Sequence, residues 1–239
     1  MTAQKFVFVH GAWHGGWCWS RVAGRLRGLG HDVFTPTQTG LADRKHLLSK
    51  DITLDTFTKD IANLVEAEEL SDVVLVGHSF GGLSISGVAD LMPERIRRLI
   101  YLDSMIVEGG RSPFDMIAPD IVAARRKAAL ETGGGISLPV PPASAFGVTD
   151  PEDSEWLRRR MTPHPLGTYE SPLNIKAPPG NGLPRTYVFC TNPVYPALEG
   201  VRRWVKAQHG WRWLELPAAH DAMVTAPAEL TELLLSEAA

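Results

Sequence analysis

One short pattern, Gly77-His78-Ser79-Phe80-Gly81, constrains this chain more than any other feature of its sequence. It directly follows Val73-Val74-Leu75-Val76, an uninterrupted apolar run that predicts a buried parallel strand. The small and apolar residues from 82 to 91 predict a helix that can pack closely against a sheet. On a sharp strand-to-helix turn a serine hydroxyl is lifted above the sheet, and flanking glycines leave room for strained backbone. The pattern therefore indicates that Ser79 is a nucleophile.

The rest of the chain continues this alternation of strands and helices. Strands are expected at 6–10, 31–34, 73–76, 97–102, 186–190 and 211–216, and helices at 20–29, 53–68, 82–91, 196–209 and 226–235. This order predicts a mostly parallel central sheet with helices on both faces. Ligands bind such sheets beyond the carboxyl ends of the strands, so the loops that follow the strands should meet at one edge.

The segment from 104 to 183 interrupts the alternation. It is rich in proline and glycine with scattered aromatic residues and methionines, and short helices are expected at 119–131 and 150–160. We interpret it as a small inserted cap, carried by an α/β core made of residues 1–103 and 184–239. A chain of 239 residues suits one domain with such an insertion.

Composition excludes several classes of function. Hydrophobic residues make up 44% of the chain, charged residues 21%, and the net charge is −3, as in an ordinary globular protein. The sequence has no basic patch for nucleic acid and no apolar run near the roughly 20 residues that span a bilayer. Its first residues enter a strand without the pattern of a secretory signal. Two cysteines, Cys18 and Cys190, do not make a disulfide framework, so we expect a cytoplasmic protein. We expect no nucleic-acid or membrane partner, and either a monomer or a homodimer.

A serine nucleophile needs a base and a site for the negative charge that develops on the substrate. His220 follows the last expected strand, which gives the chain order serine, acid, histidine that is typical of this strand-turn-helix context. The oxyanion needs backbone donors. We expect one from the N–H of Phe80, next to the nucleophile, and one from the N–H of Ala12, in the loop after the first strand.

Four segments together resemble the α/β-hydrolase superfamily, most closely the small esterases related to plant methylesterases, hydroxynitrile lyases and bacterial pyrethroid-type carboxylesterases. They are His-Gly-Ala-Trp-His-Gly-Gly-Trp-Cys-Trp from 10, Gly-His-Ser-Phe-Gly-Gly from 77, Tyr-Leu-Asp-Ser-Met from 101 and Ala-His-Asp-Ala-Met-Val-Thr-Ala-Pro from 219. The resemblance covers essentially the whole chain. It implies an α/β-hydrolase fold and a serine carboxylesterase that needs no cofactor and works through an acyl-enzyme.

One departure from this branch concerns the acid of the triad. Its methylesterases and hydroxynitrile lyases carry the acid after the strand that corresponds to 186–190, where this chain reads Cys190-Thr191-Asn192-Pro193. Asp103, at the end of the strand after the Ser79 strand, is the preferred candidate because it could accept from the Nδ1–H of His220. Asn192 orienting a neutral imidazole and Asp221, adjacent to the base, are the alternatives.

Two rival functions are weighed against ester hydrolysis. The first is a hydroxynitrile-lyase-like or C–C bond-cleaving enzyme on the same triad. The resemblance to this branch implies that its lyases have a threonine at the position of Gly11 and a lysine at the position of Asp221. Both departures favour an esterase. The second rival is a ligand-binding, receptor-like member with vestigial activity, which the missing carboxylate after Cys190 would suit.

The substrate is expected to be a small hydrophobic ester. Trp13 follows the oxyanion loop and should line the pocket, with cap residues Met105, Phe114, Phe146 and Trp156. Other apolar cap residues are expected in the pocket roof: Ile106, Met116, Ile117 and Met161. No metal is expected, because His10, His14 and His78 lack the spacing of helix-borne ligands.

Overall fold

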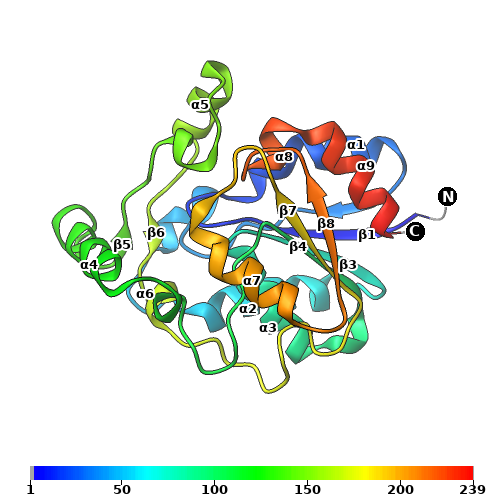
Figure 1. Ribbon diagram of the computed structural model, residues 1–239, viewed down its shortest axis with the longest axis horizontal. Helices are drawn as coiled ribbons and strands as arrows, with labels where there is room; N and C mark the ends of the chain where they lie inside the picture. Colours follow the sequence, from blue (N-terminus) through cyan, green and yellow to red (C-terminus); the bar gives the residue numbers. More distant parts are fainter. Residues whose placement is uncertain (1–2, 239) are drawn as a thin grey trace.

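A central sheet of six parallel strands organises the molecule, and the computed structural model describes residues 3–238. The order across the sheet is β2-β1-β3-β4-β7-β8 (Figure 1). The strands are β1 (Lys5–Val9), β2 (Asp32–Phe34), β3 (Val73–His78), β4 (Ile96–Leu102), β7 (Arg185–Cys190) and β8 (Trp211–Leu216). The chain leaves β1 toward β2 and returns to β3 on the other side. The strand order therefore reverses between β1 and β3, where ligands bind in sheets of this kind.

Helices cover both faces of the sheet, because alternate strand residues point to opposite faces. Phe6 and Phe8 of β1 pack in one apolar cluster with helices α1 and α9, whereas Val7 and Val9 pack in the other with α2, α3 and α7. These helices are α1 (Ser20–Gly28), α2 (Leu54–Ala67), α3 (Gly81–Leu91), α7 (Glu199–Ala207) and α9 (Pro227–Ala238). The expected α/β-hydrolase arrangement of a parallel sheet between two helical layers is confirmed.

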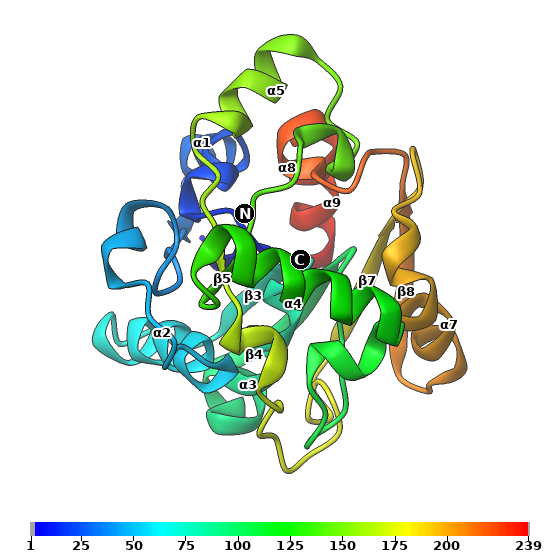
Figure 2. The same ribbon diagram turned by 90° about the vertical axis from the view of Figure 1, so that its left-hand side faces the viewer.

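Residues 104–183 cross the edge of the sheet at the carboxyl ends of its strands. In Figure 2, α4 runs in front of the strands and α5 stands above it. This segment contains α4 (Pro119–Gly133), β5 (Ser137–Leu138), α5 (Pro151–Arg158), β6 (His164–Pro165) and α6 (Gly167–Glu170). Within this segment, β5 pairs with β6 in antiparallel orientation. Asp150 caps α5 by accepting from the backbone N–H groups of Glu152 and Asp153.

Short helical turns account for most differences from the expected elements. The remaining elements are η1 (Gly16–Trp19), η2 (Ala42–Leu47), η3 (Pro93–Arg95), η4 (Pro113–Met116), η5 (Ala143–Phe146), η6 (Pro196–Leu198) and α8 (Ala222–Thr225). The helix expected at 196–209 begins as η6 and continues as α7, because Pro196 and its neighbours make one tight turn first. The loop expected between 35 and 50 contains η2.

Candidate active site

Ser79 lies on the turn between β3 and α3 with a φ of 51°, a left-handed conformation that serine seldom adopts. Glycines on both sides permit this turn. A Cβ on Gly81 would lie 2.6 Å from the carbonyl oxygen of Val9, and one on Gly77 would lie 2.8 Å from the carbonyl oxygen of Gly81. The backbones of β1, β3 and α3 therefore approach too closely for any side chain, and Ser79 stays partly exposed at the sheet edge.

His220 joins Ser79 to Asp103 through its two ring nitrogens. Its Nε2 lies 3.0 Å from the Ser79 hydroxyl, and its Nδ1 lies 2.7 Å from Asp103 Oδ2. The carboxylate can only accept, so Nδ1 carries the proton of that bond and Nε2 faces the serine hydroxyl. His220 follows β8 and Asp103 follows β4, and both are buried. The structure thus brings together the three residues expected to form a triad.

The alternative acids lie elsewhere. The side chain of Asn192 is exposed, and Asp221 turns away from the ring of His220 to bind His14. Asp103 itself has a φ of 39° and hydrogen-bonds through its backbone N–H to the carbonyl of Val188, on β7. This backbone geometry directs its carboxylate toward His220 rather than along the strand.

Sequence reasoning missed a buried arginine beside this acid. Arg202, on α7, is 4% exposed, and its Nη1 lies 3.6 Å from Asp103 Oδ1. That distance is too long for a hydrogen bond but close enough for the positive charge to stabilise the carboxylate. The helix pattern held a signal, because Arg202 stands between Val201 and Val205 on the buried face of an amphipathic helix. Charged residues are seldom buried without a partner.

Two further contacts hold the imidazole of His220 in place. The ring of Tyr195 stacks on it with 4.0 Å between ring centroids and 21° between planes. His78 donates from Nε2 to the backbone carbonyl of His220 at 2.9 Å. Burial and the nearby His220 hold the pKa of His78 well below its usual value, so this ring is neutral. His78 therefore packs beneath the turn as a hydrogen-bond donor.

The loop after β1 lies against the nucleophile. A Cβ on Gly11 would lie 2.9 Å from the Cβ of Ser79, so only glycine permits this approach. Trp13 adopts a φ of 65°, and its backbone N–H donates to His164 Nδ1 at 3.2 Å. Ala12 and Phe80, the residues expected to supply the oxyanion donors, thus stand on the two segments that meet at Ser79. Both are nearly inaccessible to solvent.

A buried ion pair connects this loop to the base. His14 Nε2 lies 3.0 Å from Asp221 Oδ2, and His14 Nδ1 lies 2.7 Å from the carbonyl of Ala12. Both partners only accept, so both ring nitrogens are protonated and His14 is an imidazolium. Burial opposes this charge, but the Asp221 carboxylate raises the pKa of His14 above its usual value. The pair ties the residue after His220 to the loop that carries Ala12.

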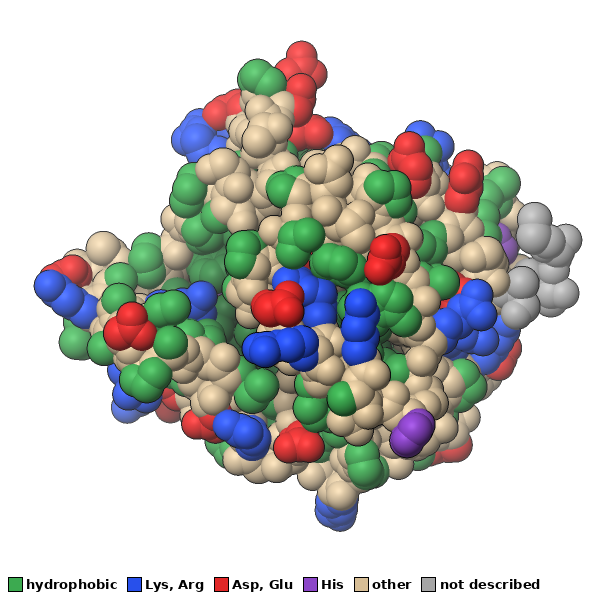
Figure 3. All heavy atoms as spheres, viewed as in Figure 1, with side chains coloured by type: hydrophobic (Ala, Val, Ile, Leu, Met, Phe, Trp, Pro, Cys, Tyr) green, Lys and Arg blue, Asp and Glu red, His purple; other side chains and the backbone are tan. Residues whose placement is uncertain are grey.

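A cavity of about 190 Å³ opens above Ser79. An engineered apolar cavity of about 150 Å³ binds benzene, so this one suits a group of about one substituted ring. Most of the lining is apolar or aromatic. It comprises Trp13, Ser79, Phe80, Met105, Met116, Ile117, Ala118, Ile121, Arg125, Tyr169, Tyr195, Ala197 and Leu198. Figure 3 shows a hollow with hydrophobic side chains between the lobe formed by α4 and the body of the molecule.

Only part of the expected pocket is found there. Trp13 and Met105 line the cavity, as do Met116 and Ile117 of the expected roof. The cavity lining does not include Phe114, Phe146 or Trp156, and it does not include Ile106 and Met161 of the expected roof either.

The aromatic rings expected in the pocket, those of Phe114, Phe146 and Trp156, pack against other aromatic rings instead. The ring of Phe114 packs on that of Tyr169, Phe146 lies behind Trp13 and His14, and Trp156 stands perpendicular to Trp17. Composition shows that the cap is apolar, but it does not show which way each ring points.

One group of potential metal ligands occurs in the described part of the chain, His78, His220 and Asp221, whose atoms lie within 4.8 Å of one another. Most of their polar atoms already take part in hydrogen bonds, and His78 Nδ1 and Asp221 Oδ1 are the exceptions. His78 donates to the carbonyl of His220, His220 bonds Ser79 and Asp103, and Asp221 accepts from His14. The cluster is best read as a hydrogen-bond network around the base.

Comparison with known proteins shows the family of the chain. Residues 6–233 match the alpha/beta hydrolase family. A carbendazim hydrolyzing esterase from Nocardioides sp. (strain SG-4G) is 40% identical over 238 residues, covering 96% of this chain and 98% of that protein. Methylesterase 10 of Arabidopsis thaliana is 29% identical over 261 residues, covering 99% of this chain and 92% of that protein.

Solved structures share the fold. An extracellular alpha/beta-hydrolase from a Paenibacillus species superposes with a TM-score of 0.83 at 23% identity, covering 98% of both chains. The pyrethroid hydrolase PytH superposes with a TM-score of 0.77 at 21% identity, covering 98% of this chain and 97% of that one. At these identities the likeness concerns the arrangement of the chain.

Proposed function

Since this chain belongs to the alpha/beta hydrolase family, we propose that it hydrolyses carboxylic esters through an acyl-enzyme on Ser79. Relatives named esterases support the hydrolysis of an ester. The observation that carries the serine mechanism is the hydrogen-bonded series Ser79, His220 and Asp103, with distances of 3.0 and 2.7 Å. A nucleophile, a base and a group that orients the base form the arrangement that activates a serine hydroxyl.

Each residue has one task in the proposed reaction. Ser79 Oγ attacks the ester carbonyl while His220 Nε2 takes its proton, and Asp103 stabilises the imidazolium that forms. The backbone N–H groups of Ala12 and Phe80 donate to the oxyanion. His220 then passes the proton to the leaving alkoxide, which departs as an alcohol. A water molecule, deprotonated by His220, attacks the acyl-enzyme and releases the acid together with free Ser79.

We propose a small hydrophobic ester as the substrate and no cofactor. The cavity has room for about one ring and is lined mostly by apolar and aromatic side chains, with the cap segment 104–183 forming its roof. One relative is named for hydrolysing carbendazim, a small molecule, which agrees with a pocket of this size. No helix in the described part of the chain is long and apolar enough to cross a membrane.

The rival functions have less support from the geometry. Asp221, which stands where a lyase of this branch would have lysine, is buried and paired with His14, so this position offers no cation to a cyanide leaving group. A vestigial triad in a receptor would be favoured by an Asp103 far from His220, whereas the two lie in hydrogen-bond contact. We therefore retain hydrolysis as the proposal.

The test is turnover of p-nitrophenyl esters from acetate to octanoate by the wild type and three variants. We expect wild-type turnover, its loss in Ser79→Ala, and a fall of about four orders of magnitude in kcat in Asp103→Asn, because the wrong tautomer of His220 then faces the serine. Asn192→Ala is the matched control and should leave the rate unchanged. A wild type that is inert toward every ester would overturn the proposal, and an active Asp103→Asn would remove Asp103 from it.

A further inference from the structure

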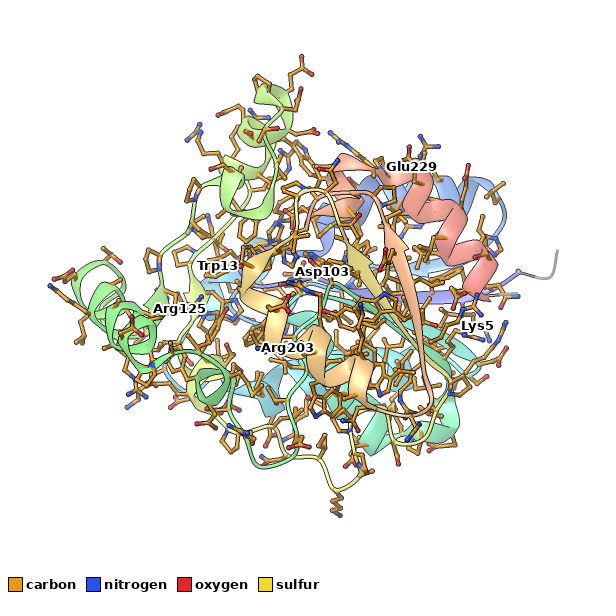
Figure 4. All side chains as sticks on the ribbon, in the orientation of Figure 1. Lys5, Trp13, Asp103, Arg125, Arg203 and Glu229 are labelled. Carbon is orange, nitrogen blue, oxygen red and sulfur yellow. The ribbon has the colours of Figure 1, made fainter. Side chains whose placement is uncertain are left out.

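Among the residues that the structure describes, Arg125 is the one cation that lines the cavity above Ser79. It belongs to α4, and Figure 4 shows its side chain reaching from that helix toward the body of the molecule. Its Nη1 is buried and has no hydrogen-bond partner. Within the described part of the chain, no carboxylate lies within 4.0 Å of its guanidinium nitrogens.

The neighbouring cations of the cap are paired. Arg126 contacts Glu170 at 3.0 Å, Lys127 contacts Glu131 at 3.7 Å, and Arg158 contacts Glu155 at 2.6 Å. These pairs lie on the outer surface with exposed side chains. Arg125 lies on the same helix as Arg126 and Lys127, but it lines the cavity and has no acidic partner.

The groups around Arg125 do not neutralise it. Its guanidinium carbon lies 5.2 Å from the ring centroid of Tyr169. Burial raises the pKa of Tyr169 to about 12, even though the guanidinium and a contact with it act in the opposite direction, so this phenol is neutral. Burial also raises the pKa of Tyr195, the other phenol of the cavity. His164, whose pKa burial and nearby charges hold well below the usual value, is neutral as well.

We propose that Arg125 binds a carboxylate of the substrate, so that the preferred substrates are esters that also carry a carboxylate. An unpaired guanidinium donor that has lost contact with water is costly, and a carboxylate gives it two parallel hydrogen bonds. This inference rests on the proposed function and narrows its substrate class. The hydrophobic lining takes the body of the substrate and Arg125 takes its charge.

The cavity volume limits where this carboxylate can be. About 190 Å³ accommodates one ring, so a group that reaches Arg125 lies a few bonds from the carbonyl at Ser79. An aromatic or short aliphatic dicarboxylic acid with one end esterified satisfies both ends of the pocket. Hydrolysis breaks the ester bond and leaves the second carboxylate unchanged.

The experiment compares two matched esters. One is the monomethyl ester of benzene-1,3-dicarboxylic acid, and the other is the same ester with the free carboxylate replaced by a carboxamide. We expect the wild type to prefer the carboxylate ester in kcat/KM. Arg125→Gln should reduce that preference by about 10- to 100-fold, mostly through KM, because one charge-assisted contact is lost. Turnover of the carboxamide ester should change by a much smaller factor, because that ester has no charge for Arg125 to bind.

Two control variants isolate the charge at this position. Arg126→Gln, which removes the neighbouring cation on the outer surface, should leave the preference intact. Arg125→Lys should retain part of it, because a lysine keeps the charge but not the two parallel donors. The inference is overturned if the wild type prefers the carboxamide ester, or if Arg125→Gln slows both esters equally.

A binding measurement separates this inference from the proposed function. Benzene-1,3-dicarboxylate is titrated into Ser79→Ala and into the double variant Ser79→Ala/Arg125→Gln by calorimetry. Weaker binding to the double variant by about tenfold or more supports the Arg125 site even if no ester is hydrolysed. Equal binding, or no binding to either protein, overturns the site even if p-nitrophenyl esters are hydrolysed.

Discussion

At the scale of single residues, the site depends on backbone conformations that side chains seldom adopt. Ser79, Asp103 and Trp13 have φ values of 51°, 39° and 65°, and each follows a strand of the sheet, directly or within a short loop. Such conformations cost of order 1–3 kcal/mol each and persist only where the surrounding structure enforces them. The packed sheet beneath the site supplies that enforcement.

The buried pair of His14 and Asp221 is a residue-scale contribution to stability. Asp221→Asn should lower the free energy of unfolding by about 3 kcal/mol, because it leaves the buried imidazolium without its counter-charge. Urea denaturation at neutral pH measures this change.

The control is Glu170→Gln, which breaks an exposed pair with Arg126 and should change the free energy of unfolding by less than about 1 kcal/mol. If the two substitutions have equal effects, His14 is not charged in the folded protein.

At the scale of elements, the turn between β3 and α3 requires glycine whereas the middle of α1 does not. Gly81→Ala places a Cβ 2.6 Å from a backbone oxygen of β1, so α3 must shift and the melting temperature should fall by several degrees. Gly24→Ala, at an exposed position of α1, meets no atom within 4 Å and should stabilise the protein by up to about 1 kcal/mol.

Calorimetric melting of the two variants and the wild type measures both expected changes, the loss of stability in Gly81→Ala and the gain in Gly24→Ala. A Gly81→Ala protein as stable as the wild type would mean that α3 does not pack this closely on β1. Its ester turnover should also fall, because a shift of α3 moves Phe80 and Ser79.

At the scale of the whole molecule, buried histidines make stability depend on pH. Burial lowers the pKa of His10 to about 4 and holds those of His78 and His164 well below 6.5. Below pH 6.5 these three histidines bind protons in the unfolded chain but stay neutral in the folded protein. The free energy of unfolding therefore falls as the pH falls. His14 has a raised pKa, so its contribution is complete below pH 6.5 and is lost only as the pH rises through its folded value.

We therefore expect the melting temperature to be highest near neutral pH and to fall between pH 6.5 and 4.5. His164→Gln should reduce this fall, whereas His46→Gln should not, because water reaches His46 in the folded protein. Melting curves at closely spaced pH values measure the slope. A melting temperature that is constant over this range would contradict the prediction.

How much of the site was predictable varied from residue to residue. Ser79 and His220 stand in local patterns, a strand followed by a turn and a loop after the last strand, so the sequence indicates them directly. Asp103 required a choice among three candidates, since it and His220 are 117 residues apart in the chain and meet only through the folding of the sheet. The cap residues were less predictable because an apolar ring packs equally well into a pocket or away from it.

The sequence by itself determined the fold and the position of the nucleophile, because apolar periodicity and glycine placement act over neighbouring residues. The tertiary structure alone decided which acid meets His220, that His14 pairs with Asp221, and that Arg125 faces the cavity without a partner. Those facts depend on contacts between segments far apart in the chain. The direction of a side chain follows from the packing of the whole molecule, and no local pattern specifies it.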